Sequence, residues 1–340
     1  MKKVIIKKGI PKEVSAKWFD RLVENSMMMP LVLRRMARLE RRIQKLYYNQ
    51  KGKKTILVWR NTGGLGDIVM HSVIARRLKE KYPRSYIIYQ VPEEYMVIPQ
   101  HNPYVDKVQV VESPFIDGGF DITVKLSNPC PAAVYESIKE PNIMKHRIDL
   151  FLEAAGLDGG DRRLIYWVED DEKRKAEEFL KEKKALEGIK IGFELRSAEN
   201  RRDWKDWRKL AELIKKEIKN SKIFIFDHDP KSAWKNGAIN VCGWKIEDMT
   251  PIVQKLDLLI CPDSGLTHLA GALGTKILGL FGPTNPLMRL NSYNADWIWL
   301  EKTCKKCPCW YIFPCGGSKC IDAITPKMVL DKVKKVLKNV

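Results

Sequence analysis

Three short apolar runs, at residues 55–59, 256–261 and 276–281, each end in a turn rich in glycine, proline or aspartate. A helix-like pattern follows the first two turns. The order strand, glycine turn, helix is typical of a parallel β-sheet covered by helices, because the chain must cross back before it adds the next parallel strand. This feature constrains the fold most, and it favours a doubly wound α/β protein.

The strand and helix pattern occurs in both halves of the chain, which predicts two such units. We expect strands at 55–59, 86–91, 105–111, 122–126, 189–193, 223–226, 256–261 and 276–281. We expect helices from the turn after 66 to about 82, and at 207–219, 249–255, 266–273 and 326–337, the last capped by Thr325. The units would join near residues 160–185, with a first domain over 55–165 and a second over 166–340. Ligands of such sheets bind beyond the carboxyl ends of the strands, so the cleft between two facing units is the expected site.

The length of 340 residues fits two domains, and the apolar content of 44% is enough for two cores. No run of about 18 apolar residues occurs, so we expect no transmembrane helix. The apolar stretch 27–33 contains Pro30, precedes two arginines and lacks a cleavage pattern of small residues. We therefore expect no secretory signal and a cytoplasmic location.

Most of the excess positive charge lies near the N-terminus. The formal net charge is +19, and residues 1–54 contain 16 Lys or Arg against 4 Asp or Glu. Such an extension indicates binding to phosphates of lipid or nucleic acid, with a merely solvated basic face as the alternative. Apolar residues recur in it at the spacing of one helix face: Met29, Val32, Met36, Leu39, Ile43 and Leu46. The sequence thus predicts a basic N-terminal helical extension.

Basic residues cover most of the remaining surface of this predicted helix. A narrow apolar stripe beneath a cationic face suits a helix that lies in a membrane interface, and anionic lipid strengthens such binding. The protein would then be peripheral on the cytoplasmic face of the inner membrane. The alternative is that the stripe packs on the protein's own surface or forms a short coiled coil, because it has heptad spacing over about three repeats.

The first glycine turn reads Gly63-Gly64-Leu65-Gly66-Asp67. Asp67 falls at a helix start, where free N–H groups and the helix dipole stabilise a carboxylate, and a simple N-cap is the structural alternative to a functional role. The fingerprint of dinucleotide-binding enzymes needs a third glycine where Val69 stands. The turn therefore argues against an NAD-dependent oxidoreductase.

The second turn, within 261–270, also precedes a helix. Ser264, Gly265 and Leu266 would present backbone N–H groups to an anion, and His268 would bind a phosphate or hold the loop. The third turn contains Gly282 and is expected to lie beside the second, unless it only ends a strand. Together these turns indicate a site for a phosphorylated ligand.

Five of the eight cysteines lie within 17 residues: Cys304, Cys307, Cys309, Cys315 and Cys320. In a reducing cytosol, clustered thiols favour a metal over disulfides. A tetrahedral zinc site takes four ligands, so one of the five would be left over. We expect a structural zinc or iron site with no catalytic part, and free thiols or disulfides are the alternatives.

Several strings now identify a relationship. The segments "GLGDIVMHSVIARRLKEKYP", "DSGLTHLAGALGTKILGLFGPTNP" and "CIDAITPKMVLDKVKKVL" resemble the ADP-heptose:lipopolysaccharide heptosyltransferases, glycosyltransferase family 9. "HNPYVDKVQVVE" and "RRDWKDWRKLAELI" are similar more weakly. The resemblance covers about residues 55–340, and its second string is the most specific.

The resemblance implies a GT-B fold with two Rossmann-like domains, an N-terminal one for the acceptor and a C-terminal one for the nucleotide sugar. It implies an inverting, metal-independent transfer of a heptose or related sugar from an ADP-heptose-like donor to a glycan or glycolipid, in lipopolysaccharide biosynthesis. Asp67 matches the general base, and Gly64, Gly66 and Gly282 match backbone positions of the loops. The residues that match donor contacts are Ser197, Arg202, Asp263, Ser264, Gly265, Leu266 and His268.

The chain departs from the family pattern at Glu194, Leu195, Val73 and Asp227, where small residues, proline or glycine are usual. These departures leave the reaction type standing and bear on the identity of base and sugar. One alternative is a degenerate transferase that binds a nucleotide sugar without turnover. Another is a basic nucleic-acid-binding protein, which is disfavoured because no such module is present.

Overall fold

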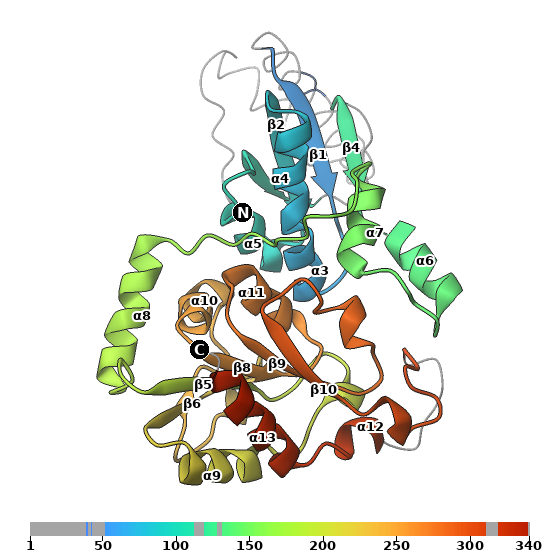
Figure 1. Ribbon diagram of the computed structural model, residues 1–340. Coiled ribbons are helices and arrows are strands. Elements are labelled where there is room, and N and C mark those ends of the chain that lie inside the picture. The colour runs from blue at the N-terminus through green and yellow to red at the C-terminus, as the bar shows by residue number, and fades with distance from the viewer. Residues whose placement is uncertain are drawn as a thin grey trace, which may run out of the picture.

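The computed structural model describes Leu39, Arg42 and residues 52–111, 119–127, 131–310 and 319–338. They form two α/β units, one above the other in Figure 1, each built around a parallel sheet. The first sheet has the order β3-β2-β1-β4. Its strands are β1 (Lys54–Trp59), β2 (Ser85–Val91), β3 (Lys107–Val110) and β4 (Ile122–Lys125).

The second sheet has the order β10-β9-β8-β5-β6-β7, and its paired strands are parallel. Its strands are β5 (Ile189–Glu194), β6 (Ser221–Phe226), β7 (Ile239–Asn240), β8 (Leu258–Cys261), β9 (Ile277–Phe281) and β10 (Ala295–Trp299). The strand order reverses at β5, which lies between β8 and β6. The carboxyl ends of these strands are the expected ligand edge. The prediction of two parallel, helix-covered sheets is confirmed.

The helices of the first unit are α3 (Leu65–Met70), α4 (Ser72–Lys81), α5 (Val97–Gln100), α6 (Pro131–Lys139) and α7 (Arg147–Ala154). The single helix expected up to about residue 82 is wrong in one respect, because it divides at His71. The N–H of His71 is shared between the carbonyl oxygens of Asp67 (3.1 Å) and Ile68 (3.2 Å), the bifurcated bonding common at helix ends.

The helices of the second unit are α8 (Asp170–Glu182), α9 (Trp207–Glu217), α10 (Ile246–Gln254), α11 (Gly265–Leu273), α12 (Lys319–Asp322) and α13 (Pro326–Leu337). Thr325 caps α13 as predicted, accepting from the N–H of Met328 at 3.3 Å. The junction expected near 160–185 contains a regular helix, α8, whose start is fixed by a capping box between Glu169 and Glu172. The domain boundary at 165/166 stays a prediction.

The apolar core continues from one unit into the other. One cluster of buried side chains contains Val58 and Val124 of the first sheet together with Leu259 and Phe281 of the second. At the junction α3 meets α11 (Figure 1). A second cluster lies on the opposite face of the second sheet, under α9 and α13. The continuous core holds the two glycine turns at the starts of α3 and α11 against each other.

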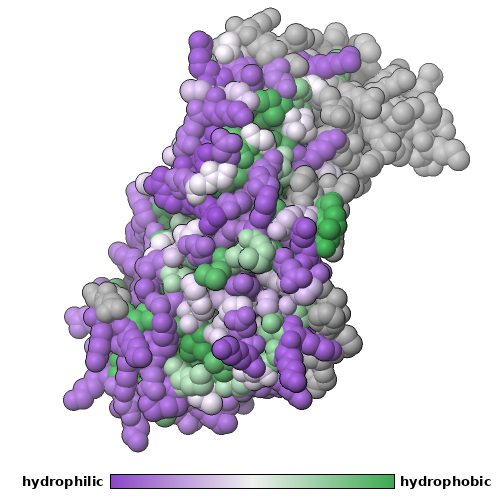
Figure 2. Space-filling view, turned by 45° about the vertical axis from the view of Figure 1, so that its right-hand side comes forward, coloured by the Kyte–Doolittle hydropathy of each residue, from purple (hydrophilic) through white to green (hydrophobic). Residues whose placement is uncertain are grey.

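The predicted basic extension lies almost wholly outside the described residues; Leu39 and Arg42 are helical and exposed. Within the part of the chain that the structure describes, no helix is both long and apolar enough to span a membrane. On the face shown in Figure 2, hydrophilic side chains dominate and apolar ones form small separate groups. Large exposed apolar side chains include Ile138 and Met144, which are 70% and 74% exposed, near the outer end of α6.

Candidate functional site

Asp67 is the third residue of α3. The N-cap is Gly64, in extended backbone with φ −92° and ψ 179°. Gly63 before it has φ +101°, a conformation that favours glycine. The N-cap role considered for Asp67 is therefore wrong, because glycine supplies the extended entry and the aspartate falls within the first turn. Its carboxylate is consequently available for contacts outside the helix.

Two arginines hold the Asp67 carboxylate. Arg60, directly after β1, donates to Oδ2 at 2.8 Å, and Nε of Arg147, the first residue of α7, lies 3.1 Å from Oδ1. Both guanidiniums lie over the buried Phe151 ring, at 5.6 Å and 5.7 Å from its centroid. Charge-assisted pairs and aromatic support of this kind fix the orientation of a carboxylate. The start of α3 thus presents a positioned acid at the junction of the two units.

The start of α11 carries the predicted anion-binding features. Ser264 is the N-cap, and its hydroxyl accepts from the N–H of Thr267 at 3.3 Å. Gly265 and Leu266 supply first-turn N–H groups, which helix geometry leaves without intrahelical partners. The hydroxyl of Ser264 also donates to Oε2 of Glu194 at the end of β5. Burial raises the pKa of Glu194 to about 8, although the bond from Ser264 lowers it; at neutral pH this acid is mostly uncharged and does not repel an anion.

His268 lies one turn into α11 and is buried. Its Nδ1 is 2.7 Å from the hydroxyl of Tyr293. Burial lowers the pKa of His268 to about 4, against the opposing charge of Asp263. The ring faces the first unit, since a Cβ built on Gly66 would stand 2.8 Å from Cδ2 of His268. A neutral imidazole beside Asp67's helix is therefore fixed at the junction.

Arg202 reaches the same turn. It follows β5 in the chain, and its Nη1 donates to the carbonyl oxygen of Asp263 at 2.6 Å and lies 3.7 Å from Oδ2. Nε of Arg289 lies 3.9 Å from the same Oδ2. Burial acts to raise the pKa of Asp263, but the charges of these two arginines outweigh it and leave the pKa lowered. The structure brings together Arg202, Asp263, Ser264, Gly265, Leu266 and His268, and their contact with a donor stays a prediction.

Ser197 closes a turn after β5, and its contact with a donor stays a prediction. Its hydroxyl donates to the carbonyl oxygen of Glu199 at 2.8 Å and lies 3.2 Å from Oδ1 of Asp203. These bonds close the turn that carries Arg202. Asp227 at the end of β6, where the family pattern favours glycine, accepts two bonds of 2.8 Å from Arg196. Asp227, which differs from the family pattern, therefore forms an ion pair at the carboxyl edge of the second sheet.

Gly282 lies beside the cysteine cluster. A Cβ on Gly282 would stand 2.9 Å from Sγ of Cys320, and its carbonyl oxygen accepts from the thiol of Cys307 at 3.5 Å. The N–H groups of Cys309 and Trp310 both donate to the carbonyl oxygen of Pro283 at 3.0 Å. The third glycine turn is thus tied to the cysteine segment by backbone bonds.

The described cysteines are free thiols. A hydrogen bond between Cys307 and Cys320 raises the pKa of Cys307 and lowers that of Cys320 to about 7. No group of three or more metal-binding side chains is arranged to hold an ion within the described ranges. Cys315 lies outside those ranges. The metal site stays a prediction.

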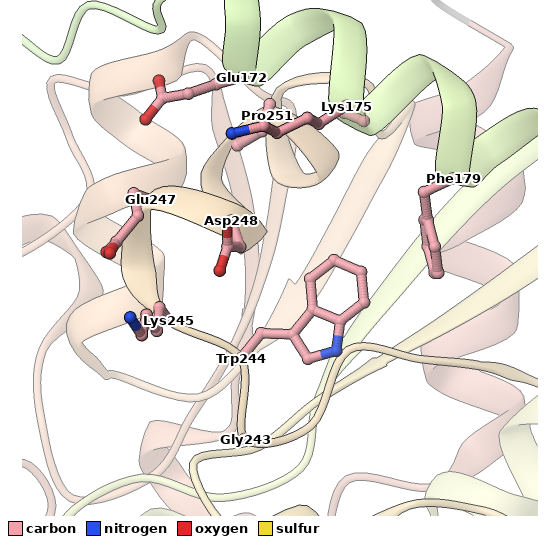
Figure 3. Close-up of a pocket in the computed structure, with 10 residues that line it drawn as sticks. Glu172, Lys175, Phe179, Gly243, Trp244, Lys245, Glu247, Asp248 and Pro251 are labelled. Carbon is pink, nitrogen blue, oxygen red and sulfur yellow. The ribbon is translucent and has the colours of Figure 1, made fainter.

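A cavity of about 410 Å³ lies between α8 and the start of α10 (Figure 3). The Trp244 indole and the Phe179 ring meet edge to face on one side of it, with centroids 4.7 Å apart. Lys245, Glu247 and Asp248 border the other side. Gly243, also in the lining, donates to the carbonyl oxygen of Asp227 at 2.8 Å, so the cavity adjoins the carboxyl ends of β6 and β7.

Sequence reasoning missed five residues of this site: Arg60, Glu136, Arg147, Arg289 and Tyr293. None belongs to the three glycine turns. Arg147, Arg289 and Tyr293 contact motif residues from farther along the chain, and Arg60 is seven positions from Asp67. Glu136 contacts Arg147 and Arg289. An arginine directly after the first predicted strand was the one local signal.

Comparison with known proteins gives a consistent relationship. Residues 131–309 match the model of glycosyltransferase family 9 (heptosyltransferase). A segment of 58 residues is 39% identical to the lipopolysaccharide core heptosyltransferase OpsX of Haemophilus influenzae. That segment covers 17% of this chain and 17% of the relative, so this alignment spans well under a fifth of the relative's length.

Solved structures agree over a greater length. A glycosyltransferase family 9 protein from Veillonella parvula has a TM-score of 0.68 and 20% identity, covering 84% of this chain and 98% of that one. The iron-containing, dodecameric heptosyltransferase TibC from enterotoxigenic E. coli, in complex with ADP-D-beta-D-heptose, has a TM-score of 0.60 and 13% identity, covering 84% and 76%. At these identities the likeness shows the fold alone, and it confirms the GT-B expectation.

Proposed function

Because the chain belongs to glycosyltransferase family 9, the heptosyltransferase family, we propose that it transfers a sugar from a nucleoside-diphosphate donor to a hydroxyl group of a glycan or glycolipid. One observation carries the proposal. The start of α3, with its positioned Asp67, and the start of α11, with its anion-binding features, meet directly through Gly66 and His268. An acid and an anion site on opposite sides of one junction are what a transfer between two substrates requires.

On the donor side, the diphosphate would lie at the start of α11. The N–H groups of Gly265 and Leu266 and the Arg202 guanidinium would stabilise the charge that grows on the leaving diphosphate, which is the usual source of rate enhancement in a reaction of this kind. His268 would donate a hydrogen bond from its other ring nitrogen, Nε2. These groups need no metal ion, and metal independence is part of the proposal.

On the acceptor side, Asp67 would act as general base. The acceptor oxygen bonds to the anomeric carbon while its proton passes to the Asp67 carboxylate, and the bond from that carbon to the diphosphate oxygen breaks. One displacement of this kind inverts the anomeric configuration. Arg60 and Arg147 hold the carboxylate in place and stay outside the proton transfer.

The donor's nucleobase would lie toward the cavity between α8 and α10. The anion site is at the end of β8, and β5 and β6 separate it from β7. Neighbouring strands are about 4.8 Å apart. The distance from the anion site to the cavity is therefore roughly the distance from phosphate to base in a nucleotide that lies across the strand ends. The Trp244 indole offers a flat apolar surface for a heterocycle.

A ligand panel separates this function from the alternatives. We expect ADP-sugars to raise the melting temperature more than GDP-, UDP- or dTDP-sugars, and NAD or oligonucleotides to have no effect, since a ligand at 100 times its Kd adds about 2.7 kcal/mol. Transfer assays then test turnover. Binding without turnover on any acceptor would indicate the degenerate transferase, and stabilisation by oligonucleotides alone would refute the donor site.

The cysteine cluster would have a structural role. Its backbone bonds hold Pro283 in the loop after β9, and a zinc or iron ion bound by these thiols would stiffen that loop. The similar protein TibC contains iron. Elemental analysis of untagged protein tests the proposal here: one equivalent of zinc or iron supports it, and much less contradicts it. Activity retained after chelation would support a catalytic step without metal.

The basic extension would bind an anionic membrane that carries a lipid-linked acceptor. The support is its sequence, a cationic face with a narrow apolar stripe. Sedimentation with anionic and neutral vesicles, comparing the full chain with one that starts at Lys53, tests it. We expect the full chain to sediment with anionic vesicles and the shortened chain not to. Equal binding by the shortened chain would exclude the extension as the tether.

A further inference from the structure

Arg289 is a buried guanidinium at the junction that the glycine turns do not account for. It follows a 3₁₀ turn, η4 (Pro286–Met288), in the segment after β9. Its side chain is 6% exposed, and it lies over the Trp310 indole at 4.5 Å from the ring centroid. This stacking holds the flat guanidinium beside Asp263, at the start of α11.

The partner of Arg289 comes from the other unit. Glu136, in α6, accepts from Arg289 Nη2 at 3.3 Å through Oε1 and from Arg147 Nη1 at 2.7 Å through Oε2. Arg147 in turn holds Asp67. A single buried carboxylate therefore joins an arginine of the first unit to an arginine of the second.

The charges of this cluster suit an exchange of anions. Four guanidiniums, those of Arg60, Arg147, Arg202 and Arg289, face three carboxylates, those of Asp67, Glu136 and Asp263. His268 beside them is neutral at pH 7. The ion-paired groups thus sum to a net charge of +1, close to balance without a ligand, so a diphosphate with two negative charges favours the departure of a carboxylate.

We propose that Arg289 is a ligand of the donor diphosphate and that Glu136 is its internal competitor, which the diphosphate displaces. Glu136 is the carboxylate to leave, because it keeps its shorter bond to Arg147, whereas Asp263 is fixed in the turn before α11 and bound through its backbone to Arg202. Guanidinium groups bind phosphate in a forked geometry, so the exchange preserves the pairing of Arg289. This inference rests on the proposed function, since it assigns further residues to the same donor site.

The test is calorimetry of the full chain with ADP, pyrophosphate and adenosine, for wild type and for Glu136→Gln, Arg289→Gln and the double variant. Arg289→Gln should weaken ADP and pyrophosphate about tenfold to a hundredfold, the value of a hydrogen bond to a charged group. Glu136→Gln should tighten both, because it removes the competing charge. The tightening should vanish in the double variant, and adenosine should bind all four proteins alike.

Glu140→Gln is the matched control. This carboxylate lies just beyond the end of α6 and interacts electrostatically with Arg147 and Arg289, yet it is not the group bonded to Arg289 Nη2. Loss of its charge should change ADP affinity much less than loss of Glu136. Equal tightening by both variants would show a general charge effect and overturn the proposal.

Further outcomes of the calorimetry separate this inference from the proposed donor site. If a folded Glu136→Gln protein binds ADP no more tightly than wild type, Glu136 is only a bridge between the units and the competitor role is refuted. If Glu136→Gln unfolds, Glu136→Asp replaces it, since the shorter acid draws back from Arg289 and should also tighten ADP. A wild-type chain that binds neither ADP nor pyrophosphate refutes the proposed donor site itself, whereas ADP binding without tightening refutes only this inference.

Discussion

Gly66 and His268 are in contact across the two units, so closely that a Cβ on Gly66 would stand 2.8 Å from Cδ2 of the imidazole. The reciprocal contact is similar, because a Cβ on Gly265 would stand 2.8 Å from Cβ of Leu65. Real Cβ atoms do not approach so closely. Glycine at both positions therefore allows the starts of α3 and α11 to touch, and this brings the acid of one unit to the anion site of the other.

The first prediction concerns this contact. Gly66→Ala must displace His268, which cannot move freely because Tyr293 holds its Nδ1 at 2.7 Å. A displacement approaching 1 Å at a reacting centre can lower the rate about a hundredfold, so we expect kcat/KM to fall at least tenfold. Gly159→Ala is the control, since its Cβ would meet only the Asp149 side chain, at an ordinary contact distance of 3.7 Å, and it should leave kcat/KM nearly unchanged. Equal kinetics of the two variants would mean that the contact does not serve transfer.

The second prediction concerns the general base. Asp67→Asn should lower the rate of single-turnover transfer by about 10²–10⁴-fold, the usual contribution of such a group, with little change in ADP-sugar affinity. The carboxylate lies in the first unit, and it forms ion pairs with Arg60 and Arg147 of that same unit. Asp149→Asn is a matched control, because Asp149 is also a first-turn aspartate bonded to an arginine, Arg162, at 2.6 Å and 2.5 Å. Near-normal transfer by Asp67→Asn would remove it as the base.

The third prediction is a pH effect on donor binding. Burial lowers the pKa of His268 to about 4, so the free protein holds it neutral at pH 7. A bound diphosphate favours the protonated ring and raises this pKa, so binding takes up a proton and strengthens as pH falls from 7 to 5. An ADP-sugar is the probe, because its diphosphate diester does not titrate in this range. His268→Ala should bind more weakly and lose the pH dependence; parallel profiles for the two proteins would place the proton elsewhere.

Eight of the ten described strands, all except β7 and β10, and the starts of α11 and α13 could be predicted from the sequence because their signals are local. Ser264 and Thr325 act as caps through bonds to residues three positions ahead, and the apolar runs before the glycine turns are buried strands. In contrast, α8 has only two buried residues, Ala176 and Leu180, in a highly charged segment. Its apolar stripe is therefore too narrow to stand out, and its capping box uses Glu169 in place of the usual serine or threonine.

Arg147 and Arg289 could not be predicted for a different reason. Arg289 is 153 positions from Glu136, and Arg147 is 80 positions from Asp67. No spacing rule relates such residues, since the packing of α7 against α3 and the meeting of α6 with the segment after β9 bring them together. Charged residues are also common on surfaces, so an isolated arginine in the sequence is most simply interpreted as solvated.

The last prediction concerns Glu194 and stability. Its pKa is about 8 in the folded chain, raised by burial from an ordinary value of 4.5. Between these values the folded state binds more protons than the unfolded state, so the contribution is fully present below pH 4.5 and is lost as pH rises through 8. At pH 7 the loss is on the order of 3 kcal/mol. Glu194→Gln cannot ionise, so urea unfolding at pH 5, 7 and 9 should show wild type weakening relative to the variant as pH rises. A difference in unfolding free energy that stays constant with pH would show that Glu194 is already ionised at pH 5. The statement that Glu194 is a neutral acid next to the anion site would then be wrong.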